Sequence, residues 1–257
     1  MCLIVLAYQT SREYPLIVAA NRDEFYQRAS APISFWGNKG EMLAGQDLTR
    51  GGVWLGITRN GRFAAVTNIR EGLLKKRFPV SRGDLAKDYL QGDLSPAQYV
   101  KTLQPGRQYG GFHLLLGDLN ELFHYSNRTE RLNPIKPGIH GVSNHLFDET
   151  WPKTKSSQQG LKELVEQNKV SHQTLQHVMA QQPVKAEANS GKTANSNLDH
   201  IKHNPFLWSQ DYGTCASSSL IVTRKDPAQT VATMDETRYR ALGIETGNRR
   251  YSFGVNS

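Results

Sequence analysis

Short apolar runs separated by polar turns dominate the first half of the chain. The runs Leu3 to Tyr8 and Leu16 to Ala20 flank a polar turn at Thr10 to Glu13, which predicts a β-hairpin. In VWLGITRNGRFAAVTN, Asn60-Gly61 separates two further apolar strands and predicts a type I′ turn, whose two central residues need positive φ. The segment GFHLLLGDLNELFHY predicts a third hairpin, which turns through Asp118 to Asn120. So many hairpins favour mainly antiparallel sheets.

Four polar-faced helices are predicted in addition. Ser81 precedes Asp84 by three residues at the start of SRGDLAKDYL, and Ser95-Pro96 opens SPAQYVKTL with an N-cap serine and a proline at the first helical position. Residues 151–168 and 171–181 give two more helical segments. We expect these helices to cover the outer faces of the sheets. Later strands are predicted over 138–142, 218–223 and 230–234.

The chain is predicted to form a single domain over residues 1–257, because neither an internal repeat nor a domain boundary interrupts the pattern. A chain of this length can bury a sizeable core. From residue 183 to residue 197 the apolar residues almost disappear, which predicts a long flexible loop. The loop is either a lid over a pocket or a tolerated surface insertion.

Composition narrows the class of protein. The net charge is +8, but the basic residues are scattered and form no nucleic-acid motif, so no nucleic-acid partner is expected. The run Leu3 to Tyr8 is too short for a membrane helix and lacks the flanks of a signal peptide, which favours a cytoplasmic protein without a transmembrane segment. Cys2 and Cys215 are too few for a disulfide framework, and the histidines have no metal-ligand spacing, so no metal site is expected.

The first hairpin gives Cys2 a chemical context. Residue numbers paired in an antiparallel hairpin add to a nearly constant total, so Cys2 is expected to lie across from Asn21-Arg22-Asp23. Removal of Met1 would give Cys2 a free α-amino group beside its own thiol. Such an amino group has a pKa of about 8 and can serve as the base for the neighbouring thiol near neutral pH. The pattern therefore predicts a nucleophile at Cys2.

Four other polar residues are candidates for the same site. Arg22 would favour the thiolate, Asp23 would orient the amino group, and the side-chain amide of Asn68 or Asn144 would donate to a developing oxyanion. Each also has a structural alternative. Cys2 is equally typical of a small buried apolar side chain, Arg22 and Asp23 of an ion pair that closes a hairpin, and the two asparagines of turn caps.

At these residues the chain resembles a known family. The motifs, in order, are MCLIV, AANRDEFYQR, FWGN, AGQD, GGVWLGIT, AAVTN, GVSN followed by ETWPK, and YGT before a strand. They resemble the NRDE family, also called the Transport and Golgi organisation 2 family, from Met1 to about Tyr239. That family is similar to cysteine N-terminal-nucleophile hydrolases of the choloylglycine hydrolase and penicillin V acylase type. The resemblance implies an α+β fold, a four-layer αββα sandwich of two mainly antiparallel sheets.

The resemblance also implies roles for individual residues. Cys2 resembles the nucleophile, Asp23 the carboxylate that holds its amino group, Asn68 an oxyanion-hole side chain and Asn144 the second asparagine. The acylases place an arginine three residues before the aspartate, so Arg22 would substitute for it from an adjacent position. These five residues form the predicted catalytic set.

Members of the family are associated with intracellular haem trafficking, with acyl-coenzyme A or lipid handling and with Golgi organisation. A haem carrier needs an apolar slot and basic groups for the propionates. The candidates here are three aromatic and four basic side chains, which are equally typical of core and solvated surface: Trp36, Trp54, Phe63, Lys75, Lys76, Arg77 and Arg82.

Two functional hypotheses follow. The first is a carrier that binds haem, or a similar apolar carboxylate or acyl ligand, without turnover. It is favoured by the family associations and by Cys215, which stands after YGT where many relatives have an arginine. The alternative is a cysteine amidohydrolase that cleaves linear C–N amide bonds through a thioester on Cys2 and needs no cofactor.

Overall fold

A computed structural model describes residues 2–37, 40–70, 78–103, 108–145, 151–181, 203–226 and 229–256. The strands form two sheets. The first sheet has the order β10-β1-β2-β11-β12-β13, in which every neighbouring pair is antiparallel. Its strands are β1 (Cys2–Tyr8), β2 (Leu16–Phe25), β10 (Gly138–Val142), β11 (Tyr212–Asp226), β12 (Gln229–Arg240) and β13 (Ile244–Gly254).

The second sheet follows the chain order from β3 to β9 and is likewise antiparallel. Its strands are β3 (Ser30–Trp36), β4 (Met42–Asp47), β5 (Val53–Thr58), β6 (Phe63–Asn68), β7 (Phe112–Gly117), β8 (Leu122–Ser126) and β9 (Arg131–Pro134). The helices are α1 (Arg82–Gln91), α2 (Pro96–Thr102), α3 (Pro152–Glu166) and α4 (His172–Ala180), with a short 3₁₀ turn, η2, at Ala241–Gly243.

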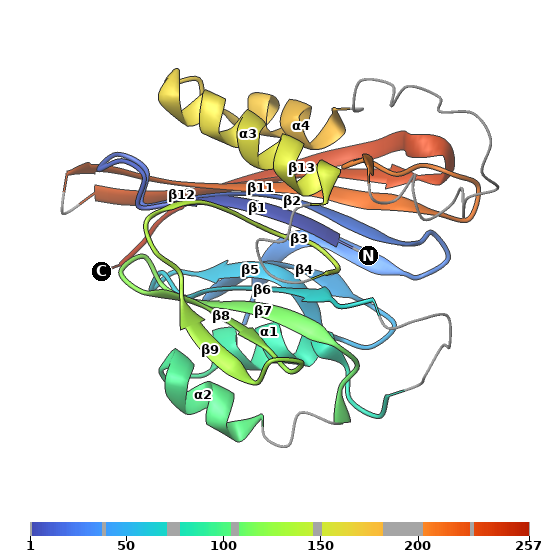
Figure 1. The fold of residues 1–257 in the computed structure, drawn as a ribbon, viewed down its shortest axis with the longest axis horizontal. Helices are drawn as coiled ribbons and strands as arrows, with labels where there is room; N and C mark the ends of the chain where they lie inside the picture. The colour runs from blue at the N-terminus through green and yellow to red at the C-terminus, as the bar shows by residue number, and fades with distance from the viewer. Residues whose placement is uncertain are drawn as a thin grey trace.

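The two sheets pack face to face, with helices on both outer surfaces (Figure 1). Helices α3 and α4 cover the first sheet, and α1 and α2 cover the second. The four-layer αββα sandwich and the α+β class predicted from the sequence are therefore confirmed.

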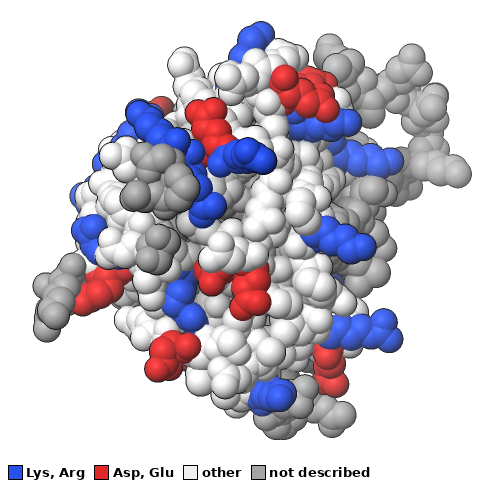
Figure 2. All heavy atoms as spheres, turned by 90° about the vertical axis from the view of Figure 1, so that its left-hand side faces the viewer, with Lys and Arg blue, Asp and Glu red and all other residues white. Residues whose placement is uncertain are grey.

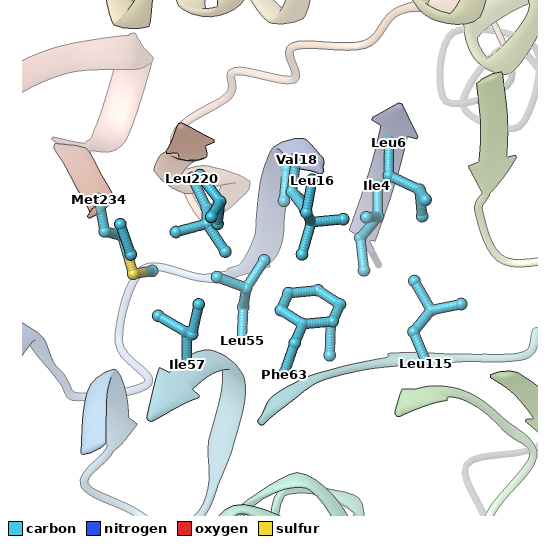
Figure 3. Packing of buried hydrophobic residues seen from close by; sticks show 14 of the residues in the cluster. Ile4, Leu6, Leu16, Val18, Leu55, Ile57, Phe63, Leu115, Leu220 and Met234 are labelled. Carbon is cyan, nitrogen blue, oxygen red and sulfur yellow. The ribbon is translucent and has the colours of Figure 1, made fainter. Parts of the chain in front are cut away.

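Both faces of each sheet are buried, which explains why the strands contain nearly continuous apolar runs. Figure 3 shows the layer between the sheets, where Phe63 of β6 points from the second sheet toward Leu16 and Val18 of β2. A separate apolar cluster lies between the first sheet and α3 and α4, and another between the second sheet and α1 and α2. Alternate residues of β1 and β2 therefore face either the second sheet or the helices.

The first hairpin has the predicted register, since Cys2 lies directly opposite Arg22. The second hairpin differs from the prediction. Gly61 has a φ of 78°, but Asn60 does not share the positive φ of a type I′ turn. The Thr58 N–H donates to Arg62 O over 2.9 Å, so three residues form the loop and glycine occupies its left-handed position.

That extra loop residue changes the register of the following strand. Leu55 lies opposite Ala65, whereas a two-residue type I′ turn would have paired it with Val66. A type I′ turn at Asn60-Gly61 also predicts that Asn68 lies opposite Val53, and the observed register contradicts this pairing by one residue. A one-residue change of register moves every side chain of the shifted strand to the opposite face of the sheet.

The helix starts largely follow their sequence signals. Ser95 and Gln98 form a reciprocal capping box at α2, with Pro96 at the first helical position. Ser81 caps α1 by accepting from the Gly83 N–H, not through a reciprocal bond with Asp84. The third and fourth helices lie within the ranges predicted for them. Strands β3, β4, β9 and β13 were not predicted.

Charge of both signs is interspersed over the end of the molecule that carries the C-terminus (Figure 2). No helix among the described residues is long and apolar enough to cross a membrane. The loop predicted over 183–197 and the basic residues Lys75, Lys76 and Arg77 lie outside the described residues.

Candidate active site

The side chain of Cys2 faces the space between the two sheets. Cys2 has the same alternation along β1 as Ile4 and Leu6, which pack in the layer between the sheets. Its partner Arg22 has the same alternation along β2 as Ala20. The hairpin therefore presents a thiol and a guanidinium side by side at one end of the layer between the sheets.

A cavity of about 690 Å³ opens at this end, and Cys2, Arg22 and Asn68 all line it. Its wall comes from β2, β4, β5 and β6 and from the segment that leads into α1. The other lining residues are Glu24, Arg28, Asp47, Thr49, Arg50, Gly52, Val53, Trp54, Val66, Thr67, Phe78, Pro79, Val80, Ser81, Arg82, Gly83 and Gly110. The lining contains more cationic than anionic side chains, so the cavity favours an anionic or strongly polar ligand.

Arg22 is held in a fixed orientation. Its side chain is only 7% exposed, one terminal nitrogen lies 3.4 Å from Asp47 Oδ2, and its guanidinium lies 4.8 Å from the centre of the Trp54 ring. Arg28 also reaches Asp47 Oδ2, over 2.6 Å. The structural alternative for Arg22 was an ion pair with Asp23. The ion pair that Arg22 makes among the described residues is with Asp47 instead, because Asp23 points to the opposite face of the sheet.

The two predicted asparagines meet. Asn144 Nδ2 donates to Asn68 O over 2.8 Å and lies 3.2 Å from Asn68 Oδ1. Asn144 is 1% exposed and follows β10, while Asn68 ends β6, so this contact ties the two sheets together. Because Asn68 Oδ1 accepts from Asn144, the Asn68 amide group remains a donor on a residue that lines the cavity. A side-chain amide donor beside a cavity is one of the groups that an oxyanion site uses.

Asp23 lies on the helix-facing side of β2. It shares the alternation of Ile17 and Ala19, which pack toward α3 and α4. Thr214 of β11 donates to Asp23 Oδ1 over 2.9 Å, and the hydroxyl of Tyr212 donates to the Asp23 carbonyl over 3.2 Å. Burial raises the pKa of the Asp23 carboxyl, while the nearby Lys153 opposes that rise.

Lys153 is a residue of this site that the sequence reasoning missed. It lies in the first turn of α3, and its side chain is completely buried. Burial lowers the pKa of Lys153, and the charges of Asp23 and Cys2 oppose that shift. The residue is the lysine of the ETWPK motif, and a cation at the positive end of a helix is the signal that could have drawn attention to it.

The Cys2 thiol is not ionised by its surroundings alone. Burial raises the pKa of Cys2, the terminal amino charge and Arg22 lower it, and the negative charge of Asp23 raises it.

Cys215 occupies a bulge in β11 opposite Arg22 and Asp23, where its Sγ lies 3.4 Å from the Glu24 carbonyl oxygen. Burial raises the pKa of Cys215 as well.

Among the described residues, those predicted to bind haem are not gathered in one place. Trp54 and Arg82 line the cavity at Cys2. Trp36 instead lines a second cavity, of about 660 Å³, beside the end of α1. Phe63 is completely buried between the sheets. The predicted aromatic slot is therefore not assembled from these three rings.

The fold defines a class of protein. Two antiparallel sheets that pack face to face, with helices on both outer surfaces, are the architecture of the N-terminal-nucleophile hydrolase fold. A solved structure of the Caenorhabditis elegans N-acylethanolamine-hydrolyzing acid amidase ortholog is similar, with a TM-score of 0.54 and 13% sequence identity over 86% of this chain and 92% of that chain. At this identity the similarity shows the fold alone.

The sequence comparisons show the family. The profile of the Transport and Golgi organisation 2 family matches residues 1–240, so the chain belongs to this family. The chain is 36% identical to the Transport and Golgi organization protein 2 homolog of Bos taurus over 66% of each protein. It is 37% identical to the Mus musculus homolog over 65% of this chain and 66% of that one. The matched region thus spans about two thirds of these relatives.

Proposed function

We propose that the chain is a cysteine amidohydrolase that cleaves linear C–N amide bonds with Cys2 as its nucleophile. The observation that carries this proposal is the shared cavity, in which the Cys2 thiol lies with Arg22 and with Asn68, whose amide is oriented by Asn144. A nucleophile, a cation and an oriented amide donor beside one cavity are the groups that acyl transfer requires.

The chemistry follows from these groups. Cys2 Sγ attacks the amide carbonyl, the Asn68 amide donates to the oxyanion, and collapse breaks the C–N bond to give a thioester and a free amine. Water then attacks the thioester and releases a carboxylic acid and the Cys2 thiol. The proton from the thiol passes to the α-amino group of Cys2 and then to the departing amine, which requires removal of Met1.

Burial of the thiol makes this base necessary. Because the pKa of Cys2 is raised, the thiol is mostly protonated near neutral pH, and attack needs a group that accepts its proton. Asp23 supports this arrangement from the opposite face of β2, since its negative charge favours a protonated amino group after transfer.

A direct test begins with the intact mass, to establish that Met1 is absent. The protein is then incubated with fluorogenic N-acyl amides of increasing acyl length and with hydroxylamine, which traps a thioester as a hydroxamate. We expect hydrolysis and trapping with the unaltered protein and with Cys215→Ala, and neither with Cys2→Ala. A processed protein that hydrolyses no amide and yields no hydroxamate would sink the proposal.

A second candidate function is the binding of haem or a similar apolar carboxylate without turnover. It is favoured by Trp54 and by the arginines that line the cavity, Arg28, Arg50 and Arg82. Titration with haem, followed by the Soret band, should then saturate near one haem per chain, and Arg82→Ala should weaken binding. Absence of saturation would exclude this candidate.

A further inference from the structure

The histidines His113 of β7 and His124 of β8 are buried, and the proposed reaction gives them no role. They are 1% and 3% exposed. Both side chains face the layer between the sheets, because they share the alternation of Leu115 and Leu122 along the same strands. Burying imidazole rings in an apolar layer is costly unless their nitrogens form hydrogen bonds, so the contacts of this pair indicate why it is there.

The contacts of His113 fix the position of its proton. His113 Nε2 bonds to the carbonyl oxygen of His145, and a carbonyl oxygen can only accept, so Nε2 carries the hydrogen. Burial lowers the pKa of His113 to about 4, so the ring is neutral near neutral pH and its Nδ1 is an acceptor. His124 Nε2 lies 2.9 Å from that Nδ1 and therefore donates to it. The bonds run in one direction, from His124 through His113 to the backbone of His145.

This chain of bonds ends one residue after Asn144. The Asn144 carbonyl accepts from the Arg70 N–H over 3.0 Å, and the next carbonyl, that of His145, accepts from His113. Arg70 follows β6 and His113 belongs to β7, whereas Asn144 follows β10 of the first sheet. Two consecutive carbonyls that come from the first sheet are thus held by groups of the second.

The side chain of Asn144 depends on where this backbone is held. Its Nδ2 lies 2.8 Å from Asn68 O, 3.2 Å from Asn68 Oδ1 and 3.3 Å from Thr67 Oγ1. Thr67 pairs directly with His113 in the register of β6 and β7, so the backbone bond and the side-chain contacts are neighbours in the second sheet. An amide on a short side chain reaches three such atoms only while its own backbone stays in place. Loss of the His113 bond should therefore displace the Asn144 amide from Asn68.

We propose that His113 is a positioning residue of the candidate active site, which holds the backbone beside Asn144 so that the Asn144 amide keeps Asn68 oriented at the cavity. The inference rests on the proposed function in treating the Asn68 amide as the donor to the oxyanion. His113 acts through Asn144 and touches none of the reacting atoms. His124 supports it by donating to Nδ1, which keeps the His113 hydrogen on Nε2.

Two substitutions of His113 separate this bond from the mere loss of an imidazole. His113→Asn keeps a side-chain acceptor for the His124 N–H, but it is too short to reach the His145 carbonyl. His113→Gln is longer by one methylene group and can donate to that carbonyl. The matched control is His172→Phe, which removes an imidazole that bonds Ser219 over 2.7 Å on α4, on the helix side of the first sheet.

The first measurement is NMR spectroscopy of the isotope-labelled full chain. In the unaltered protein near neutral pH, a long-range ring spectrum should show His113 protonated at Nε2 and not at Nδ1. His113→Asn should shift the side-chain amide resonances of Asn68 and Asn144. His113→Gln should restore them, and His172→Phe should leave them unchanged.

The second measurement separates positioning from general damage. For a hydrolysed N-acyl amide, kcat of His113→Asn should fall about tenfold with KM unchanged, as expected when an interaction made only in the transition state is weakened. Alkylation of Cys2 by iodoacetamide forms no oxyanion, so its rate should stay that of the unaltered protein. His113→Gln should recover most of the lost kcat.

Three results would overturn the inference. They are a His113 ring protonated at Nδ1 in the unaltered protein, amide resonances that do not move in His113→Asn, and a normal kcat in that variant. If His113→Asn does not fold, the ring spectrum of the unaltered protein and the amide resonances of His113→Gln still decide, since displaced resonances in His113→Gln would refute the role of the bond. The NMR measurements need no substrate, so the expected shifts in a protein that hydrolyses no amide would retain the positioning of Asn144 while refuting the hydrolase.

Discussion

Substitution of Phe63 tests whether this residue belongs to the core or to the ligand site. The sequence suggested it as part of an aromatic slot, whereas the structure buries it completely between the sheets. Its backbone pairs with Ile57 on one side and Gly117 on the other, in the middle of the second sheet. Its ring lies among leucines of both sheets (Figure 3). Phe63→Ala would therefore leave a cavity at the centre of the molecule.

The expected cost follows from that burial. Truncation of a fully buried phenylalanine lowers the free energy of unfolding by about 3–5 kcal/mol. For a chain of this size, each kcal/mol lowers the melting temperature by about 2–4 °C, so the variant should melt about 10 °C lower. Urea unfolding followed by tryptophan fluorescence would measure the difference, with an unchanged dependence on denaturant concentration if both proteins unfold in one step.

Phe123→Ala provides the matched control. Phe123 lies on β8 and is only half-buried, so its truncation should cost about 1 kcal/mol. The reasoning would be refuted if Phe63→Ala were as stable as this control while amide turnover or haem affinity fell sharply. Phe63 would then contact ligand, and the layer between the sheets would not be a closed core.

Three further predictions concern the site and its supports. Asn144→Ala leaves the carbonyl of Asn68 without its 2.8 Å donor, so the free energy of unfolding should fall by about 1–3 kcal/mol and thioester trapping should fall with it; normal trapping would contradict the assigned role. Burial lowers the pKa of His113 to about 4, below its unfolded value of about 6.5. Up to about 3 kcal/mol of the free energy of unfolding present above pH 6.5 should therefore be lost as the pH falls toward 4. His113→Gln should flatten that part of the curve of stability against pH. A Cβ at Gly52 would lie 2.5 Å from Gly83 Cα, so Gly52→Ala should displace α1 from the cavity wall. The variant should have a lower melting temperature and a changed ligand affinity, and an unaltered melting curve would show that the two backbones are not in contact.

The parts of the site set by local pairing could be predicted from the sequence. Cys2 and Arg22 are brought together by a short hairpin, so counting from the turn was sufficient to pair them. The same counting failed by one residue at Asn60, because a turn with one additional residue satisfies the same Asn-Gly signal. Local sequence restricts which turns are possible, but the packing of the flanking strands selects among them.

The parts set by packing between layers could not be predicted in this way. Lys153 becomes part of the site only because α3 lies over β1, and no periodicity within the helix indicates which strand lies below it. Trp36 and Trp54 both lie on strands of the second sheet, yet they line different cavities. The proximity of Asn68 and Asn144 could not be predicted from local pairing either, since they are 76 positions apart and meet only through the contact between the two sheets. Only the resemblance of motifs pointed to both residues.

The pairing of β2 with β11 has a consequence for how the protein is made. Thr214 donates to Asp23 across 191 positions of sequence, so the partner strand leaves the ribosome long after the first hairpin. At about 5–20 residues per second, this delay is roughly 10–40 s. Throughout it, the outer edge of β2 has unpaired backbone groups that can bind another nascent strand. Slow translation and high expression should therefore favour aggregation of the incomplete chain, and a chaperone that covers the hairpin should suppress it.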